Sequence, residues 1–178
     1  MGGRGSSSMT SSASSEAAFS EEIKELVMDY VGTGYRTLRR AMRNESVLGG
    51  PANPATVDKA RKLDSWLDGG SYGEPIYRGI GIKDEGLAQL VPGAEINQLD
   101  AMSSWSKDIG NAEEFSRWTD YNSVVFRMNG GTSHGRDIES LGLDYGEHEV
   151  TVSSHSTQRI TAVHKGKNGI IYIDVEEV

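Results

Sequence analysis

Cysteine is absent from the sequence, and this absence excludes disulfide bonds and thiolate metal sites. The sequence also lacks a run of the roughly 18 apolar residues that a membrane helix needs, and its start lacks the apolar segment of a signal peptide. An excess of positive charge is missing as well, since the net charge is −8 and the isoelectric point about 5.0. We therefore expect no membrane association, and nucleic acid is a poor candidate partner.

The acidic residues are concentrated in one part of the chain. Residues 1–63 carry nine basic and seven acidic side chains, whereas residues 64–178 carry nine basic and nineteen acidic ones. Such an acidic part is suited to attract cationic targets. The same charge also serves solubility alone, and that simpler explanation has the advantage when charge is the only observation.

Length and composition predict one domain with many loops. The chain has 178 residues, of which 22 are glycine, and 36% are hydrophobic, which suits a β-containing protein better than a helical bundle. Residues 1–19 are rich in glycine and serine and almost uncharged, so we expect a disordered tail there. A single domain is expected at 20–178.

Three helical patterns open this domain. Apolar residues recur at helical spacing behind a serine in 20–31, then "GTG" interrupts the pattern, which resumes with several arginines in 35–43. The third pattern has Asn53 as its cap, Pro54 at the first helical position and Gly69 just past the end.

Short strands follow the helices. Two short helices are predicted among them, at "DEGLAQLVPG" and "NAEEFSRW". The predicted strands are, in order, "EPIYRGIGI", "AEINQLDAMSSWS", "SVVFRMN", "HEVTVSS", "RITAVHKG" and "GIIYIDVEEV". Helices first and strands afterwards predict an α+β fold, with an antiparallel sheet or sandwich packed under the helices.

One arginine lies inside the first apolar strand. Burial of the Arg78 guanidinium is costly unless it meets an anion, and Gly79 and Gly81 leave room for a ligand to approach the backbone. A structural salt bridge, or an edge position with the charged head in water, explains Arg78 equally well when it is considered alone.

Two serines lie on one face of the next predicted strand. Ser104 and Ser106 flank Trp105, which points to the opposite face. Such hydroxyls can bind ribose hydroxyls or orient a carboxylate. A serine-rich strand end that leads into a loop is common, so the pair indicates little by itself.

Two glutamates stand one residue apart where a turn becomes a strand. Glu147 and Glu149 would face the same side and repel each other, while His148 would face the core with Val150 and Val152. A solvated sheet edge tolerates such a pair without any function. The four histidines lack metal-like spacing, so no metal site is expected.

Taken together and in this order, the arginine, the S-x-S and the E-x-E resemble the arginine–serine–glutamate signature of mono-ADP-ribosyltransferases. Within this family, the motifs are most similar to those of the arginine-specific branch of bacterial toxins and bacteriophage enzymes. The resemblance covers about residues 20–178. The segments that carry it are "VMDYVGTGYRTLRRAMR", "IYRG", "LVPGAEINQLDAMSSWS", "AEEF" and "GTSHGRDIESL" followed by "YGEHEVTV".

This resemblance implies N-terminal helices on a two-sheet antiparallel β core, with a cleft that takes NAD as substrate and needs no metal. Arg78 is then expected to bind the phosphate or ribose side of NAD, and the Gly79 backbone its nicotinamide amide. Ser104, supported by Ser106, would position the ribose or the catalytic carboxylate. Glu149 would oppose the charge of an oxocarbenium-like centre and bind the 2′-hydroxyl.

The other glutamate is linked by the resemblance to the acceptor. Relatives that modify other side chains commonly carry Gln here, so Glu147 implies an arginine acceptor. A guanidinium is a cation at neutral pH, and Glu147 would hold it and take its proton. The expected partners are therefore NAD and a protein with an exposed arginine. Tyr35 is expected in the NAD site, and Tyr145 in the substrate-facing loop.

The sequence departs from the family pattern at two positions. Trp105 replaces the middle Thr of S-T-S, and Arg39 stands where the family often has Asn, which alters a contact on the adenosine side. Trp105, Phe115 and Arg117 are candidates for the aromatic and the arginine that contact nicotinamide and phosphate.

Three alternatives stay open on the sequence. The first is an NAD glycohydrolase that uses water as acceptor, and the second is transfer to a side chain other than arginine. The third is a non-catalytic interaction or virion domain of the same fold. In the absence of a signal peptide, we expect action in the cytoplasm of a target cell, with synthesis there, delivery by a virion or secretion machine, or release from a longer chain.

Overall fold

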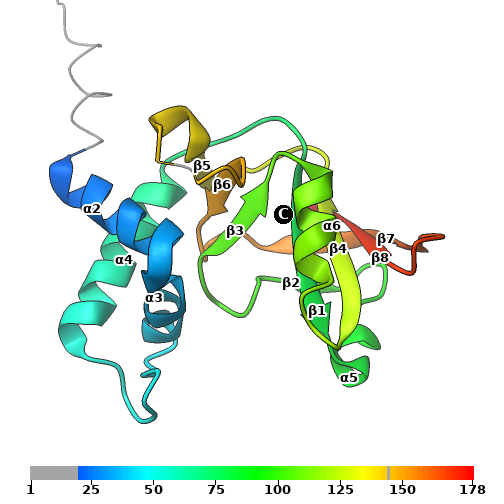
Figure 1. Ribbon diagram of the computed structural model, residues 1–178, viewed down its shortest axis with the longest axis horizontal. Coiled ribbons are helices and arrows are strands. Elements are labelled where there is room, and N and C mark those ends of the chain that lie inside the picture. The colour runs from blue at the N-terminus through cyan, green and yellow to red at the C-terminus, as the bar shows by residue number, and fades with distance from the viewer. Residues whose placement is uncertain (1–19, 144) are drawn as a thin grey trace, which may run out of the picture.

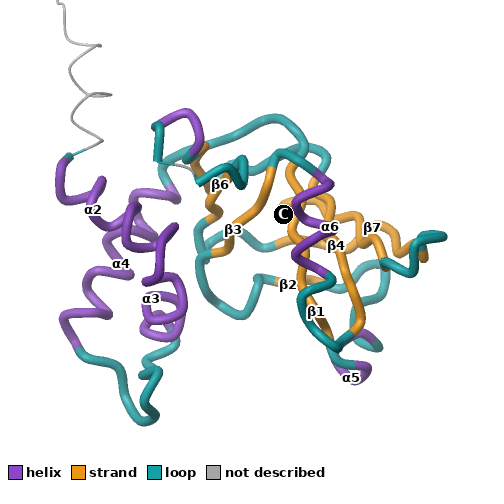
Figure 2. The backbone as a smooth tube through the Cα atoms, viewed as in Figure 1, coloured by secondary structure: helices purple, strands orange, loops and turns teal. Residues whose placement is uncertain are grey.

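The computed structural model describes residues 20–143 and 145–178, and the tail expected at 1–19 lies outside them. A group of N-terminal helices stands beside an eight-stranded sheet (Figures 1 and 2). Within the described part of the chain, no helix combines the length and the apolar character needed to cross a bilayer.

The three helices form where their capping residues predict them. Ser20 accepts the amide of Ile23 at 3.3 Å, and the Asn53 side chain accepts the amide of Ala55 at 2.9 Å, so both side chains satisfy free N–H groups at a helix start. The helices are α2 (Glu21–Asp29), α3 (Tyr35–Met42) and α4 (Pro54–Asp68).

The predicted interruption between α2 and α3 is a kink rather than a loop. A π-helical turn spans Tyr30–Gly34, and Gly32 in it has a non-helical ψ of −109°. A Cβ at Gly34 would lie 2.3 Å from the Asp29 carboxylate, so a larger residue here would have to displace that side chain. The kink therefore brings Tyr30 and Tyr35 to neighbouring positions at the end of the helical layer.

The sheet has the order β2-β7-β8-β4-β1-β3-β6-β5. Its neighbours are antiparallel except β4 and β8, which run parallel. The strands are β1 (Ile76–Ile82), β2 (Glu95–Ile96), β3 (Ser103–Ser106), β4 (Asn122–Met128), β5 (Gly135–Asp137), β6 (Glu149–Val152), β7 (Gln158–Lys165) and β8 (Ile171–Glu177).

The expected α+β class is confirmed, with two differences in the sheet. All eight strands form one hydrogen-bonded sheet instead of two, but its halves meet at the single pair Tyr77–Ser106 between β1 and β3. The parallel pair arises because β8 returns antiparallel from β7 and is inserted between β7 and β4. The almost separate halves leave space for a cleft where β1 and β3 diverge.

The prediction of one continuous strand at 94–106 is wrong. Three consecutive residues, Gln98, Leu99 and Asp100, have left-handed φ values of 56°, 66° and 55°, and this loop separates β2 from β3. An unbroken strand cannot accommodate left-handed residues, so β2 pairs with β7 while β3 pairs with β6. The short strand β5 was not predicted.

His148 does not face the core as the alternation predicts. Its φ is 53°, so the strand begins only at Glu149, and the half-exposed imidazole lies 3.1 Å from the Glu139 carboxylate. Val150 and Val152 are fully buried, as expected. The left-handed residue therefore re-aims the chain between the two glutamates.

Helix α6 (Ile109–Ser116) packs directly on β1 in front of the sheet (Figure 1). A Cβ at Gly79 would lie 1.6 Å from the Ala112 carbonyl oxygen, and one at Gly81 would lie 1.8 Å from Thr119 Oγ1. Gly79 is thus required by the main chain of α6, and Gly81 gives room to the Thr119 side chain, whereas the sequence suggested access for a ligand.

Candidate active site

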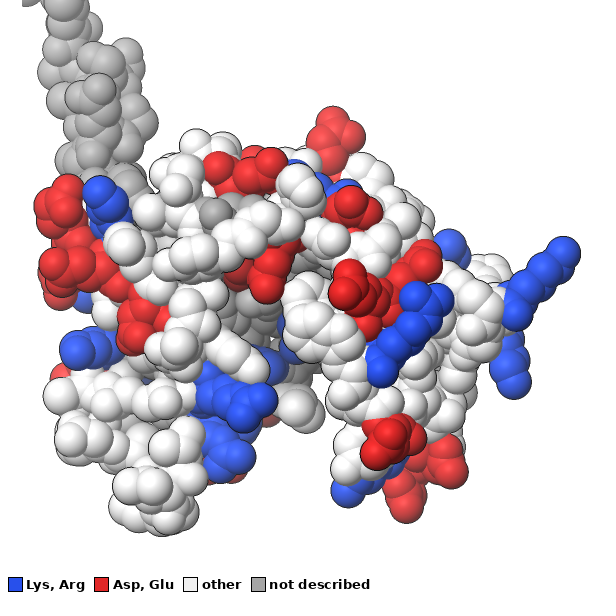
Figure 3. Space-filling model, in the orientation of Figure 1, with Lys and Arg blue, Asp and Glu red and all other residues white. Residues whose placement is uncertain are grey.

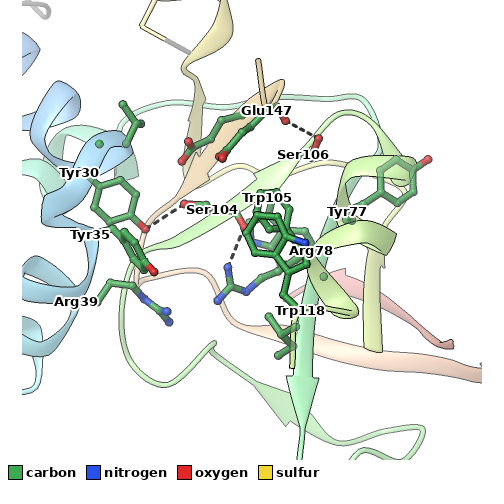
Figure 4. A pocket seen from close by; sticks show the side chains of 17 residues that line it. Tyr30, Tyr35, Arg39, Tyr77, Arg78, Ser104, Trp105, Ser106, Trp118 and Glu147 are labelled. Carbon is green, nitrogen blue, oxygen red and sulfur yellow. Dashed lines mark hydrogen bonds between the residues drawn. The ribbon is translucent and has the colours of Figure 1, made fainter. Parts of the chain in front are cut away.

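A cavity of about 380 Å³ opens between the helical layer and the sheet (Figure 4). Residues from the kink, α3, β1, β3, α6 and the start of β6 line it. We call Arg39, Arg78 and Gln98 the cationic wall, and Glu147, Glu149 and Thr151 the acidic wall. Gln98 and Thr151 belong to the walls because each holds a charged group that lines the cavity.

Arg78 extends from β1 into the cavity and is held by two neutral oxygens. Its Nε donates to Gln98 Oε1 at 3.0 Å, and its Nη1 donates to the Ser104 carbonyl at 2.9 Å. Burial, and next the charge of Arg39, lower the pKa of Arg78 to about 10. The group therefore stays cationic at neutral pH, but its charge is poorly solvated.

Arg39, on α3, contributes a second guanidinium to the same wall. Its Nη2 donates to the Gln98 carbonyl at 3.1 Å, and its buried Nε has no hydrogen-bond partner among the described residues. Across residues 20–143 and 145–178, neither Arg39 nor Arg78 lies within 4.0 Å of a carboxylate oxygen. Two uncompensated cations side by side are suited to bind an anion with several oxygens.

The two serines have different surroundings. Ser104 Oγ lies on the cavity side, 3.4 Å from the Tyr30 hydroxyl to which it donates. Ser106 Oγ donates to the Glu147 carbonyl at 2.7 Å and accepts the Asp108 amide at 3.0 Å. Ser106 thus ties the β3 end to the Glu147 segment, whereas Ser104 is available to a ligand.

Glu149 is the buried carboxylate of the acidic wall. Only 3% of it is exposed, and Thr151 Oγ1 donates to its Oε1 at 2.7 Å. Tyr30 lines the same cavity, and its burial, and next the charge of Glu149, raise the pKa of this phenol. A fixed, buried carboxylate in this position strongly stabilises a positive charge beside it.

Glu147 lies on the open side of the same wall. Its carbonyl accepts from Ser106 Oγ and, at 3.1 Å, from Asn111 Nδ2, so the main chain is fixed while the side chain is exposed at the cavity (Figure 4). The two glutamates therefore share one cavity from different depths, and only the outer one is open to a large partner.

Among the remaining candidates, Tyr35, Gly79, Trp105 and Phe115 line the cavity. Arg117 is exposed and does not line it, and Tyr145 lies outside it. Trp118, which sequence reasoning missed, takes this place, with its ring centroid 4.4 Å from that of Phe115. The turn at the end of α6 determines which of the adjacent side chains points inward.

Three further residues were missed on sequence. Tyr30 was interpreted as part of the apolar face of α2, and Gln98 was hidden inside a predicted strand. Thr151 left a usable signal, since it lies two residues beyond Glu149 on the same strand face. Their polar groups hold Ser104, Arg78 and Glu149 respectively.

Charge is distributed unevenly around the hollow between the helical layer and the sheet (Figure 3). Lys and Arg side chains gather over α3, while acidic side chains lie above the hollow and over α6 (Figure 3). The arginines of α3 are Arg36, Arg39 and Arg40. Among the described residues, no three His, Asp or Glu side chains are grouped to hold a metal ion.

No protein-family model matches the chain, and no curated protein matches its sequence. Solved structures do match. The Vis toxin of Vibrio splendidus has a TM-score of 0.66 at 27% identity, over 93% of this chain and 80% of that one. Its complex with agmatine has a TM-score of 0.68 at 27% identity, over 89% and 75%.

Exoenzyme S from Pseudomonas aeruginosa, bound to carba-NAD and human 14-3-3 protein beta, has a TM-score of 0.64 at 16% identity over 92% of this chain and 77% of its own. The chain has the ADP-ribosyltransferase fold. This confirms the fold expected from the resemblance. The similarity to Vis and other ADP-ribosyltransferases also supports the resemblance to ADP-ribosyltransferases in general. In this ADP-ribosyltransferase fold, the cavity lies at the junction of β1 and β3, with β6 beside it.

Proposed function

We propose that this protein transfers ADP-ribose from NAD to arginine side chains of target proteins and releases nicotinamide. The observation that carries the proposal is the pairing of the cationic wall with the acidic wall across one cavity. NAD is a dianion at its pyrophosphate and a cation at its nicotinamide ring, so its two ends match the two walls. We propose residues 20–178 as the single catalytic domain.

The cationic wall would bind the pyrophosphate. Arg39 and Arg78 retain N–H donors that no carboxylate of the described residues occupies, and charge-assisted bonds to phosphate oxygens are strong. Tyr35 and Phe115 would contact the nucleotide and the nicotinamide, and the Gly79 main chain would meet the carboxamide.

The acidic wall would perform the chemistry. As the bond between nicotinamide and ribose breaks, its electron pair leaves with nicotinamide and positive charge develops on the ribose. Glu149, held by Thr151, would oppose this charge and bind the 2′-hydroxyl. Ser104 Oγ, next to Tyr30, would position the ribose.

Glu147 would serve the acceptor. A guanidinium nitrogen attacks the anomeric carbon, and the proton that it loses as the new C–N bond forms passes to Glu147 and then to solvent. The exposed position of Glu147 leaves room for a protein substrate. The Vis complex with agmatine supports the acceptor class, because agmatine carries a guanidinium.

A second candidate is NAD hydrolysis, with water as acceptor. It is favoured by the open side of the cavity, from which water can reach the site beside Glu149. Neighbours named as toxins and type III effectors support action inside a target cell.

One assay separates the candidates: release of nicotinamide from NAD with and without agmatine, together with formation of ADP-ribosyl-agmatine. Glu149→Gln is expected to lower both activities by about 10²–10³-fold. Glu147→Gln is expected to abolish transfer and to leave hydrolysis within about threefold. Glu25→Gln, on the exposed face of α2, is the control.

Wild-type hydrolysis without any agmatine product would favour the glycohydrolase. Transfer that survives Glu147→Gln would contradict the role of Glu147. Absence of both NAD binding and turnover would overturn the proposed function and favour the non-catalytic interaction domain.

A further inference from the structure

Gln98 connects the two guanidiniums of the cationic wall. Its side-chain oxygen accepts from Arg78 Nε at 3.0 Å, and its main-chain carbonyl accepts from Arg39 Nη2 at 3.1 Å. The residue is only 8% exposed. One residue thus fixes both cations, through two different groups.

The backbone at this point is unfavourable for its residues. Gln98, Leu99 and Asp100 are all left-handed, a conformation that non-glycine residues adopt at a cost. Such outliers persist where the surroundings hold them, and they cluster at functional sites. Here the left-handed loop turns the Gln98 carbonyl toward α3 and its side chain toward β1.

Buried neighbours also fix which way the Gln98 amide points. Gln158 Nε2 donates to the Ser156 carbonyl at 3.2 Å and to Ser156 Oγ at 2.7 Å, so the Gln158 oxygen faces the other way. That oxygen lies 3.5 Å from Gln98 Nε2 and can only accept from it. The Gln98 oxygen is therefore directed at Arg78.

The neutrality of these acceptors matters. A carboxylate at this position would also hold both arginines, but it would cancel one of their two charges. Amide and carbonyl oxygens orient the guanidiniums and leave both charges to an incoming anion.

We propose that Gln98 is a positioning residue for NAD: its neutral oxygens hold Arg39 and Arg78 side by side, with both charges available to the pyrophosphate. This inference rests on the proposed function. It predicts that an acidic residue in this place weakens NAD binding even where it stabilises the fold.

The test compares Gln98→Glu, Gln98→Met and the matched control Gln89→Glu, which adds the same charge at an exposed site after α5 (Asp84–Leu87). The KM and kcat for NAD hydrolysis, the Kd for ADP-ribose and the melting temperature are measured for each. Gln98→Glu is expected to raise KM and Kd about tenfold with kcat within about twofold. Its melting temperature should equal or exceed that of the wild type.

Gln98→Met removes the side-chain hydrogen bonds at similar volume and keeps both charges, so we expect KM to rise about threefold and the melting temperature to fall. The control should match the wild type. Wild-type turnover with an unchanged KM in Gln98→Glu would overturn this inference alone. No NAD binding by the wild type would overturn the proposed function and this inference with it.

Discussion

On the cationic wall, Arg39 and Arg78 are partly buried, and they donate hydrogen bonds to oxygens of Gln98 and Ser104. On the acidic wall, Glu149 is buried and accepts from Thr151, whereas Glu147 is exposed and its carbonyl accepts from Ser106 Oγ. The cationic wall and Glu149 are thus partly or fully buried, whereas Glu147 is the solvent-exposed part of the acidic wall. We infer that NAD affinity depends on a rigid site, while the choice of acceptor depends on an exposed one.

The strongest way to break this comparison is Arg78→Lys. Lysine keeps the charge but cannot donate to Gln98 Oε1 and the Ser104 carbonyl in the fixed geometry of a guanidinium. We expect the KM for NAD to rise about 30–100-fold, as for the loss of one strong charge-assisted hydrogen bond. Steady-state NAD hydrolysis measures it, with Lys83→Arg as the exposed control. A KM within threefold of the wild type would show that charge alone suffices on this wall.

Thr151→Val tests the inner half of the acidic wall. Valine has the same shape, but it removes the donor to Glu149 Oε1 and leaves a buried carboxylate less well oriented. We expect kcat for nicotinamide release to fall about tenfold with little change in KM. The control is Thr161→Val on the exposed face of β7. An effect on KM instead of kcat would place Thr151 in NAD binding.

Tyr30→Phe tests the contact between the helical layer and β3. The phenol accepts from Ser104 Oγ at a long 3.4 Å, and its raised pKa keeps it neutral in the assay range. Removal of such a weak bond is expected to lower kcat/KM about threefold. Tyr121→Phe is the exposed control. A loss above about thirtyfold, more than one neutral hydrogen bond explains, would give this hydroxyl a direct role in the chemistry.

The cavity residues on β1, β3 and β6 could be found from sequence because their strands have clear patterns. Arg78, Ser104 and Glu149 lie in or next to predicted strands, in the order that the resemblance requires. The helical layer was predictable for a similar reason, since Asn53 and Pro54 mark a helix start by local chemistry.

The residues around these side chains were harder to find. Gln98 lies in a left-handed loop without glycine, so no local signal marks the break in the strand. His148 was placed in the core because strand alternation was extended one residue too far. Helix α6 ends at Ser116, so the turn after it, rather than a helical repeat, determines that Trp118 and not Arg117 lines the cavity.

The smallest expected effect concerns the outer half of the acidic wall. The hydrogen bond from His148, and also that from Lys107, lower the pKa of the Glu139 carboxylate below its ordinary value of about 4.5. A lowered folded-state pKa means that this contact contributes above about pH 4.5 and is lost as the pH falls through the folded-state pKa. Because Glu139 is exposed, its contribution to stability is small.

Glu139→Gln should therefore lower transfer to agmatine by about twofold at pH 7 and leave NAD hydrolysis unchanged. It should also make the fall in melting temperature below about pH 4.5 shallower than in the wild type. Both are measured beside Glu176→Gln on β8, an exposed glutamate far along the chain from the acidic wall. An equal loss of hydrolysis and transfer would mean that the two glutamates are not separable, because an anchor of the outer segment would then also set the position of Glu149.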